Sequence, residues 1–418
     1  MSDAKRQNLL LIGTIVAFAA LSVLVTLVLV LGKRARDAEA VARDAESQIA
    51  TLQREARTAE NRAKRARAQA GELIGFFTEG LREEMQSIGR TDLLEQAARR
   101  AESYFEALPP TDIDSSSDYH HAKMLILRAW AHYDQGALAE SEAAFARAVE
   151  LLEKHALADD ADSLLVDTLA HIHNESALPL GLAGRWDEAE QKHKLALGLY
   201  DSLIANEPEE PSWRHGRATA LFGLADVARN RAMAPPEADR EEILGVVEQF
   251  SQALGAIDAA LEHQPDDPNY IALKMYCLTN RGQTRIRAER YNDAQADAEA
   301  ATELGERLLQ LEPKRKKWRR EYATLVNNIG SLLDDRGEHE RASAFLEKAR
   351  GLRKELIAFD PGNANWRSEL ANSEYNRAIN LQLRGDLAGA SEAAAQCLSQ
   401  MQTILRAEPG SRIWQDNL

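Results

Sequence analysis

The sequence predicts an all-α protein in which a transmembrane helix and a coiled-coil neck precede a solenoid of paired helices. Three observations lead to this fold class: a 23-residue run without charge near the N-terminus, an unbroken heptad pattern after it, and a proline–aromatic pair that recurs along the rest of the chain. Aromatic residues make up only 6% of the 418 residues, while Ala, Leu, Glu and Arg are abundant, which is typical of packed helices. The predicted segments are an N-terminal tail (1–8), a transmembrane helix (9–31), a coiled-coil neck (32–78), two juxta-repeat helices with a loop (79–116) and the solenoid (117–418).

The apolar run from Leu9 to Leu31 carries no charged residue. At the α-helical rise, a helix of this length spans roughly 34 Å, which is enough to cross the hydrocarbon core of a bilayer. A cleaved signal peptide is the alternative, but its apolar region is shorter and ends at small residues, whereas this run ends at Lys33 and Arg34. We therefore expect a single-pass protein of the cell (inner) membrane that contacts the lipid bilayer through residues 9–31. Basic residues flank both ends of the run, so the side of the membrane on which the solenoid lies stays open.

Small and apolar residues after the membrane run alternate in steps of three and four, which is the spacing of a coiled-coil seam. Most of them are Ala, and only Ile49 and Leu52 are large within the central stretch. Two interpretations stay open. One is a parallel homodimer, favoured because membrane tethering raises the effective concentration; the other is a single extended helix, since Ala seams bury little area. The seam positions are Ala35, Ala38, Ala42, Ala45, Ile49, Leu52, Ala56, Ala59, Ala63, Ala66, Ala70, Leu73 and Phe77.

Residues 75–110 predict two further helices before the repeats. Gly89 breaks the first of them, and Thr91 can cap the second. Pro109 and Pro110 then end the second helix, and a polar loop follows.

A proline followed five residues later by Trp or Tyr recurs at spacings of 57, 48, 48 and 48 residues. A fixed period of this size indicates stacked units that bury their faces against one another rather than around a central core. We expect each unit to be two antiparallel helices, and the aromatic residue of each pair to have a structural role. We expect the longer spacing of 57 residues to come from a nine-residue insertion around Met233. The pairs are Pro208/Trp213, Pro265/Tyr270, Pro313/Trp318, Pro361/Trp366 and Pro409/Trp414. The predicted units, numbered 1 to 6, are 117–160, 161–209, 210–266, 267–314, 315–362 and 363–410.

A glycine is expected at the turn between the two helices of a unit, because glycine accepts a positive φ at a helix C-terminus. Gly337 is followed five residues later by Ala342, which is small where the helices must approach. Pro179 lies inside the first helix of unit 2 and is expected to kink or split it. The same turn pair recurs as Gly385/Ala390 and Gly184/Ala189, with Glu289/Ala294 and Gly136/Ser141 as degenerate copies.

The phrases GRWDEAEQKHKLAL, GEHERASAFLEKA and GDLAGASEAAAQCL, within residues 117–418, resemble the tetratricopeptide repeat (TPR) family in their turn glycine and the small residue that follows. The units are 48 residues long, against about 34 in that family, so longer helices are expected. The segment GFFTEGLREEMQSIGRTDLLEQAARRAESYFEALP is similar to one that precedes such repeats in bacterial multidomain signalling proteins. Their effector domains often lie upstream, where this chain has eight residues before the membrane run, so any effector is expected to be a separate protein.

Units 4 to 6 align so that Asn280, Asn328 and Asn376 occupy one position of the first helix, nine residues before the turn. In the TPR family, recurring polar residues on this helix line the concave groove and bond a bound peptide. Amides suit that task because each one donates and accepts a hydrogen bond. The alternative is a hydrogen bond between repeats that supports the stack. Arg281 and Arg285 are predicted to add electrostatic support for a peptide or protein ligand.

Composition and motifs exclude several classes of function. The net charge of −15 disfavours nucleic acid as a partner, because affinity for nucleic acid comes mainly from neutralised phosphates. Cys277 and Cys397 lie 120 residues apart without metal-ligand spacing, so we expect no metal and no disulfide framework. No catalytic or cofactor-binding motif is present, and we expect neither cofactor nor enzymatic activity. The sequence therefore predicts a membrane-anchored scaffold that binds a peptide or protein segment in a solenoid groove. The alternative is a regulatory or sensory subunit of a bacterial signalling system that controls a separate effector.

Overall fold

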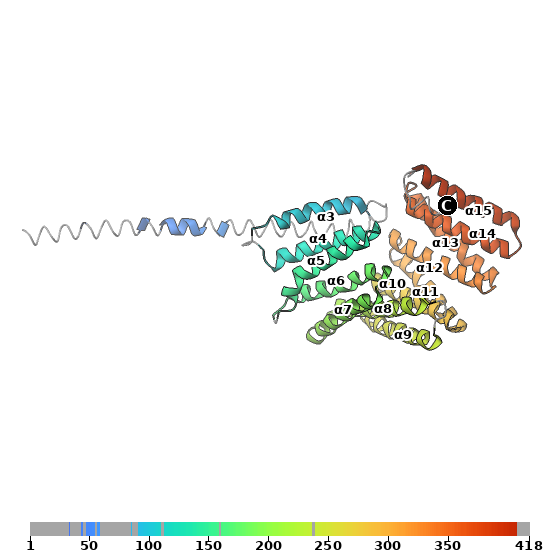
Figure 1. The fold of residues 1–418 in the computed structure, drawn as a ribbon, viewed down its shortest axis with the longest axis horizontal. Coiled ribbons are helices and arrows are strands. Elements are labelled where there is room, and N and C mark those ends of the chain that lie inside the picture. The colour runs from blue at the N-terminus through green and yellow to red at the C-terminus, as the bar shows by residue number, and fades with distance from the viewer. Residues whose placement is uncertain are drawn as a thin grey trace, which may run out of the picture. The chain divides into compact units, whose positions relative to one another are not determined.

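The computed structural model describes residues 91–109, 113–158, 160–235 and 239–407, together with residues 33, 43–44, 47–54, 57–58 and 85. Every regular element in these ranges is an α-helix (Figure 1). No helix of the described ranges is long and apolar enough to cross a membrane. The predicted transmembrane helix at 9–31, most of the neck and the Pro409/Trp414 pair lie outside the described residues.

The chain divides into two compact parts, Met1–Glu72 and Leu73–Leu418. In the first part the described residues are helical, and the seam residues Ile49 and Leu52 are 55% and 64% exposed. A homodimer would cover these side chains, and a single helix would leave them in water, so the dimeric neck stays a prediction.

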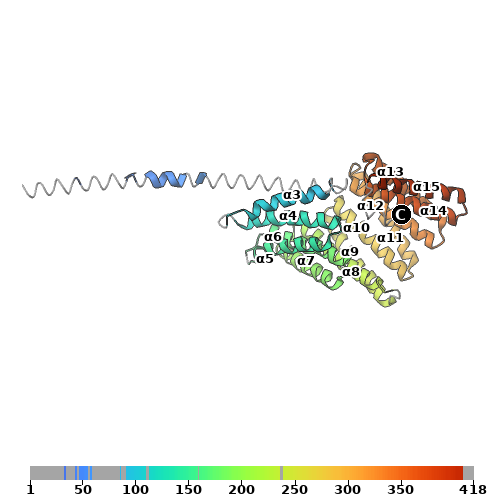
Figure 2. The ribbon, with the colours of Figure 1, turned by 45° about the horizontal axis from the view of Figure 1, so that its top comes forward.

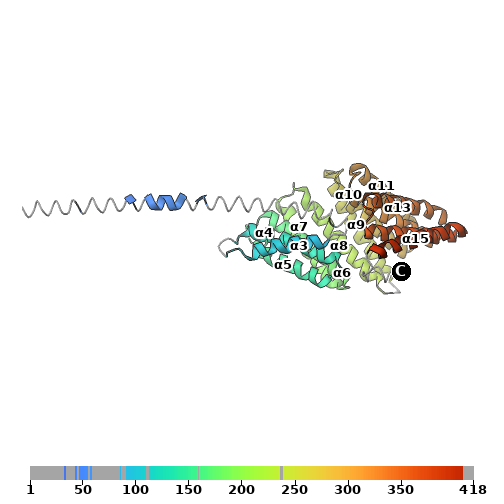
Figure 3. The same cartoon turned by 90° about the horizontal axis from the view of Figure 1, so that it is seen from above.

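The second part contains the helices that are labelled in Figure 1, and Figure 2 and Figure 3 show the same succession from two other sides. In chain order they are α3 (Thr91–Glu106), α4 (Ser115–Asp134), α5 (Leu138–Ala156), α6 (Ser163–Leu182), α7 (Trp186–Asn206), α8 (Pro211–Met233), α9 (Arg240–His263), α10 (Pro268–Arg287), α11 (Tyr291–Leu311), α12 (Lys316–Asp335), α13 (His339–Phe359), α14 (Ala364–Leu383) and α15 (Leu387–Ala407).

From α4 onward, the helices form six consecutive pairs, and each helix packs on the one before it and the one after it. The predicted helical-pair solenoid is therefore confirmed, with units 1 to 6 formed by α4/α5, α6/α7, α8/α9, α10/α11, α12/α13 and α14/α15. Helix α3 packs on α4 through a cluster that includes Leu94, Phe105 and Leu127. The largest buried cluster extends over α8 to α13, which shows that the core runs along the stack instead of filling one centre.

The turns inside five of the six units have the same geometry. Gly136, Gly184, Gly337 and Gly385 have φ between 73° and 85°, and Glu289 takes the same left-handed conformation at 61°. In each of these turns the amide of the following residue bonds a carbonyl five residues back, as in Arg290 to Arg285 at 2.7 Å. This is the Schellman closure of a helix C-terminus, so the structure places even the degenerate copy at Glu289 in the predicted turn.

The aromatic residue of each described proline–aromatic pair is buried. Trp213, Tyr270, Trp318 and Trp366 are at most 8% exposed, and each lies near the start of the first helix of its unit. Their burial agrees with the structural role expected from the sequence, because a wide ring removes a large apolar area from water.

Two local expectations have different outcomes. Helix α6 continues through Pro179 to Leu182, so the proline does not split it. Pro179 lies in the last turn, so only three helical residues follow the point at which its missing N–H interrupts the hydrogen-bond pattern. At the predicted place of the insertion, α8 ends at Met233 and α9 begins at Arg240, and both helices are longer than those of units 4 to 6, so part of the added length is helical.

Candidate binding cleft

The first helices of five consecutive units line one cleft, with a volume of about 990 Å³. Side chains come from α4, α6, α8, α10 and α12, and the second helix α7 adds two more. Successive first helices also touch one another, as α4 does with α6 and α6 with α8. Because five units reach the same space, this stretch of the stack curves with its first helices on the inner side.

The lining residues recur at helical spacing on the inner face. Asn174, Leu178 and Leu182 follow one another four residues apart on α6, and Phe222, Asp226 and Asn230 do so on α8. Residues four apart lie on the same side of a helix, so each set forms one stripe facing the cleft.

Apolar and aromatic side chains dominate the walls. Leu178 and Leu182 are 42% and 66% exposed, although both line the cleft. Large aliphatic side chains in this position bury little area within the chain itself, so they can contact an apolar ligand group. The aromatic residues that line the same space are Trp130, Tyr133, Trp186, Phe222 and Tyr276.

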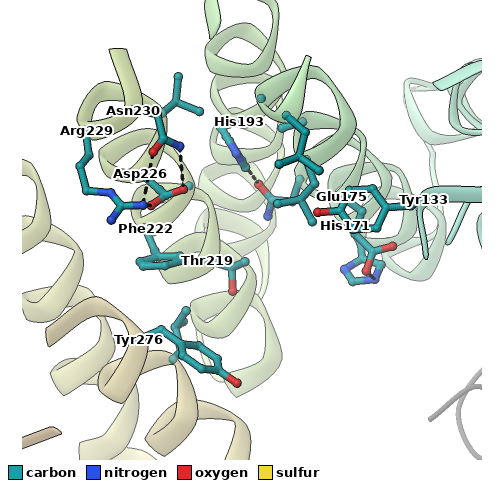
Figure 4. Close-up of a pocket in the computed structure, with 18 of the residues that line it drawn as sticks. Tyr133, His171, Glu175, His193, Thr219, Phe222, Asp226, Arg229, Asn230 and Tyr276 are labelled. Carbon is teal, nitrogen blue, oxygen red and sulfur yellow. Dashed lines mark hydrogen bonds and ion pairs between the residues drawn. The ribbon is translucent and has the colours of Figure 1, made fainter. Parts of the chain in front are cut away.

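One wall carries a carboxylate that is held in place by two neighbours (Figure 4). Glu175 accepts a hydrogen bond of 2.6 Å from the indole of Trp130 on its Oε2 atom. Its Oε1 atom lies 3.1 Å from Nε2 of His171, whose side chain is about half exposed. The charge of Glu175 raises the pKa of His171, because it favours the protonated imidazole.

The opposite wall carries a second carboxylate, on α8. Asp226 lies 2.9 Å from Nη2 of Arg229 and accepts hydrogen bonds from the amides of Asn230 and Asn280, the latter at 2.8 Å. Arg229 also donates to Gln283 at 3.0 Å. These bonds join α8 to α10 and neutralise the carboxylate, so this wall is rigid and has little net charge.

Part of the cleft is built by close packing around a histidine. Nδ1 of His193 lies 3.0 Å from Oδ1 of Asn174, whose amide donates to the carbonyl of Gly216. The His193 ring lies against Gly223, where an added Cβ would come within 2.2 Å of it. Burial lowers the pKa of His193 to about 4, so the ring is neutral at physiological pH.

The predicted site residues are not gathered in this cleft. Asn280 reaches its edge through Asp226, which is the bond between repeats that was the alternative expectation. Asn328 is exposed and lines a separate hollow of about 30 Å³ between α10, α11 and α12, while Asn376 is half-buried on α14. Arg281 and Arg285 each lie 2.6 Å from the buried carboxylate of Asp297 within their own unit. A role for these five residues in binding stays a prediction.

The helix position that Asn280, Asn328 and Asn376 share nevertheless lines the cleft in units 2 and 3. Counting nine residues back from Gly184 gives Glu175, and the same helix position in unit 3 is Gly223; both line the cleft. Sequence reasoning missed them because it searched for a repeated amide, and these units carry a carboxylate and a glycine. The sequence contains the apolar residues Leu178 and Leu182, but it cannot show which face of α6 is covered by neighbouring helices.

The described residues contain no group of three or more His, Cys, Asp or Glu side chains placed to hold a metal ion. The cleft offers apolar surface, aromatic faces and two carboxylates that are fixed by their neighbours. This arrangement can bind apolar side chains.

No family model matches the chain, and no curated protein matches it. Solved structures with some likeness include BtubC (BKLC) from P. vanneervenii, which is 16% identical with a TM-score of 0.38 and covers 77% of this chain and 93% of its own. A thermophilic TPR protein in Thermus thermophilus is 17% identical with a TM-score of 0.30, over 58% of this chain and 96% of its own. YrrB, described as a TPR protein with an unusual peptide-binding site, is 14% identical with a TM-score of 0.25, over 65% and 96%. With TM-scores this low, the description of the chain as a solenoid of helix pairs rests on its own helices and turns.

Proposed function

We propose that this protein is a membrane-anchored interaction scaffold that binds a peptide or protein segment in the cleft, and that it acts by binding and not by catalysis. One observation carries the proposal: Leu178 and Leu182 stand exposed on the inner face of α6, beside the aromatic side chains that line the cleft. Covering such side chains yields about 25 cal/mol per Å² of apolar area, which favours a ligand with apolar side chains of its own.

The polar groups of the cleft support an orienting role. Glu175 and Asp226 are fixed by Trp130, His171, Arg229 and Asn280, so they need no reordering when a ligand arrives. A volume of about 990 Å³ has room for several side chains of one segment.

The membrane anchor and the signalling role belong to the proposal and come from the sequence alone. Residues 9–31 would hold the scaffold at the cell (inner) membrane as a single-pass protein, and the neck would bring two copies together. In the alternative, a regulatory subunit would use the same cleft to contact a separate effector. The identity of the captured partner distinguishes the two: an effector enzyme supports regulation, and a structural protein supports a scaffold.

The test places a photo-crosslinking residue, p-benzoylphenylalanine, at Leu182 in the full-length protein in its native membrane. The matched control places it at Leu383, which is 51% exposed at the same register of α14 and does not line the cleft. We expect a discrete crosslinked partner from position 182 alone. Leu178→Lys should reduce its capture at least tenfold, while Ile379→Lys, at the corresponding position of unit 6, should leave it unchanged. Leu178 and Ile379 are both partly exposed, so neither change disturbs the core.

Equal capture from positions 182 and 383, or capture at 182 that survives Leu178→Lys, would place the binding site outside the cleft. A triple variant, Asn280→Ala with Asn328→Ala and Asn376→Ala, tests the site predicted from the sequence in the same assay. If the partner is lost in the triple variant and retained in Leu178→Lys, the three amides and not the cleft form the binding site.

A further inference from the structure

The largest buried apolar cluster of the solenoid ends at unit 5. It has members on every helix from α8 to α13, and none of its described members lies on α14 or α15. Helix α14 nevertheless packs on both α12 and α13, and it buries Trp366 and Leu370 (Figure 1). The other residues between these three helices therefore decide how firmly unit 6 is attached to unit 5.

Two neighbouring positions of the first helix change from apolar to polar in unit 6. Counted from the aromatic residue of each unit, they are apolar in units 3, 4 and 5, and they are Ser373 and Glu374 in unit 6. Ser373 is 0% exposed and Glu374 is 2% exposed, so both polar side chains lie inside the protein. The apolar counterparts are Ala220, Cys277 and Leu325 at the first position, and Leu221, Leu278 and Val326 at the second.

Glu374 is held by arginines on both sides of the interface. Its Oε1 atom accepts a hydrogen bond of 2.6 Å from Nε of Arg350 on α13. Its Oε2 atom lies 3.6 Å from Nη1 of Arg377 on α14, and Arg377 also donates to Glu347 on α13. Ion pairs between α13 and α14 thus stand where the earlier units have apolar contacts.

Arg353 places a second buried charge in the same interface. Its side chain on α13 is 4% exposed, and Nη1 donates to the Ser373 hydroxyl at 2.5 Å and to the backbone carbonyl of Glu369. Neither acceptor is charged, and Nε of Arg353 has no hydrogen-bond partner among the described residues. Burial lowers the pKa of Arg353, because it disfavours the charged guanidinium. The Ser373 hydroxyl donates in turn to Asn327 on α12 at 3.2 Å.

These residues, Arg350, Arg353, Ser373, Glu374 and Arg377, are here called the polar junction. Buried charges lose their hydration, and pairing returns that loss only in part. They regain water when the units separate, whereas an apolar interface would leave its surface exposed to water. Separation at the polar junction is therefore less costly than separation between the apolar faces of units 3 to 5.

We propose that unit 6 is an order–disorder element, in which α14 and α15 separate at the polar junction and unfold as one block while α4 to α13 stay folded. The two helices unfold together because a single helix pair cannot bury its own apolar face. This inference is independent of the proposed binding function, because the cleft is lined by units 1 to 5 and the described residues of unit 6 contribute nothing to it.

Amide hydrogen exchange of the full-length protein, followed by peptide mass spectrometry at low urea concentrations, measures this opening. We expect equal protection factors in α14 and α15, at least tenfold lower than those in α12 and α13. Equal protection in units 5 and 6 would overturn the proposal. A gradual loss of protection from α14 to the end of α15 would also overturn it, because that is fraying of a chain end and not the opening of a block.

Two variants test the polar junction in opposite directions. Glu374→Gln leaves two arginines opposite a neutral amide, and it should speed exchange in α14 and α15 at least tenfold. Arg353→Met combined with Ser373→Ala removes the buried charge and keeps an apolar chain in its place, and it should slow the same exchange at least tenfold. Glu392→Gln, at an exposed position of α15, is the matched control and should change nothing.

The protection of α10 to α13 should stay the same in every variant. If Glu374→Gln leaves unit 6 permanently unfolded, retained protection in α12 and α13 supports the proposal. Loss of protection in those two helices together with unit 6 contradicts it. Unchanged exchange in Glu374→Gln, or exchange in the double variant that is as fast as in the wild-type protein, would show that the polar junction does not control the opening.

Discussion

Glu289 is an exception to the repeated use of glycine at the turn between the two helices of a unit. It holds φ at 61° in the turn between α10 and α11, where four other units have glycine. The left-handed region costs a residue with a Cβ about 1–2 kcal/mol. The turn forms despite this cost because its closing bond from Arg290 to Arg285 and the packing of the two helices determine the backbone there.

Glu289→Gly should therefore stabilise the protein. Relief of the strained backbone outweighs the greater freedom that glycine has in the unfolded chain, and we expect a net gain of about 0.5–1 kcal/mol. Urea unfolding followed by circular dichroism measures it, as a higher midpoint with an unchanged slope. Gly337→Ala, at φ 80°, is the control and should shift the midpoint down. A lower midpoint for Glu289→Gly would show that its side chain stabilises the turn.

At the scale of helices, adjacent units approach closely where a glycine faces an aromatic ring. An added Cβ would come within 2.1 Å of the Tyr322 ring at Gly305, and within 2.0 Å of the Tyr200 ring at Gly216. In both cases one partner lies on the second helix of a unit and the other on the first helix of the next. The missing Cβ lets the ring fill the space between units, which sets the distance between α11 and α12.

Gly305→Ala should destabilise the protein, because the Tyr322 ring must move out of a packed interface. Overpacking of this kind costs about 1–3 kcal/mol. Gly255→Ala is the matched control: Gly255 lies inside α9 with nothing within 4 Å of an added Cβ. There alanine should stabilise the helix by about 0.5–1 kcal/mol. Thermal unfolding compares the two variants, and a destabilisation of equal size in both would show that the contact with Tyr322 plays no part.

Over the whole solenoid, buried histidines link stability to pH. Burial lowers the pKa of His173 and of His193 to about 4, well below the 6.5 of an exposed histidine. The unfolded chain therefore takes up protons between pH 6.5 and 4 that the folded chain excludes. His171 behaves in the opposite way: its raised pKa adds stability that is complete below pH 6.5 and is lost as the pH rises through the folded-state pKa. His173 and His193 therefore change the stability below pH 6.5, and His171 changes it above pH 6.5.

We expect the free energy of unfolding to fall as the pH is lowered from 6.5 to 5, by up to about 1.4 kcal/mol per pH unit for each such histidine. His193→Gln keeps a polar group opposite Asn174 and removes the proton uptake of one imidazole. The variant should lose stability more slowly on acidification than the wild-type protein does. Urea midpoints at pH 7, 6 and 5 measure the difference, and parallel curves for both proteins would remove His193 from the acid response.

Several features of this molecule followed from the sequence because each is local or periodic. The helix pairs, the turns at Gly184 and Gly337 and the place of the insertion depend on residues within one unit, and the repeat period shows each of them several times. The buried position of rings such as Trp318 followed from the same regularity. The membrane run and the heptad seam are equally local patterns, and they remain predictions because they lie largely outside the described residues.

The set of residues that line the cleft depends on the tertiary structure. Its walls bring Trp130 and Lys317 to one space, although three whole units of chain lie between them. Small rotations between successive units add up over α4 to α12, and no single unit encodes their sum. The pairing of Asn280 with Asp226 and of Arg281 with Asp297 likewise depends on which helix faces touch. The sequence by itself determined that the chain is a stack of helix pairs; the accumulated curvature of that stack decided which inner faces line the cleft.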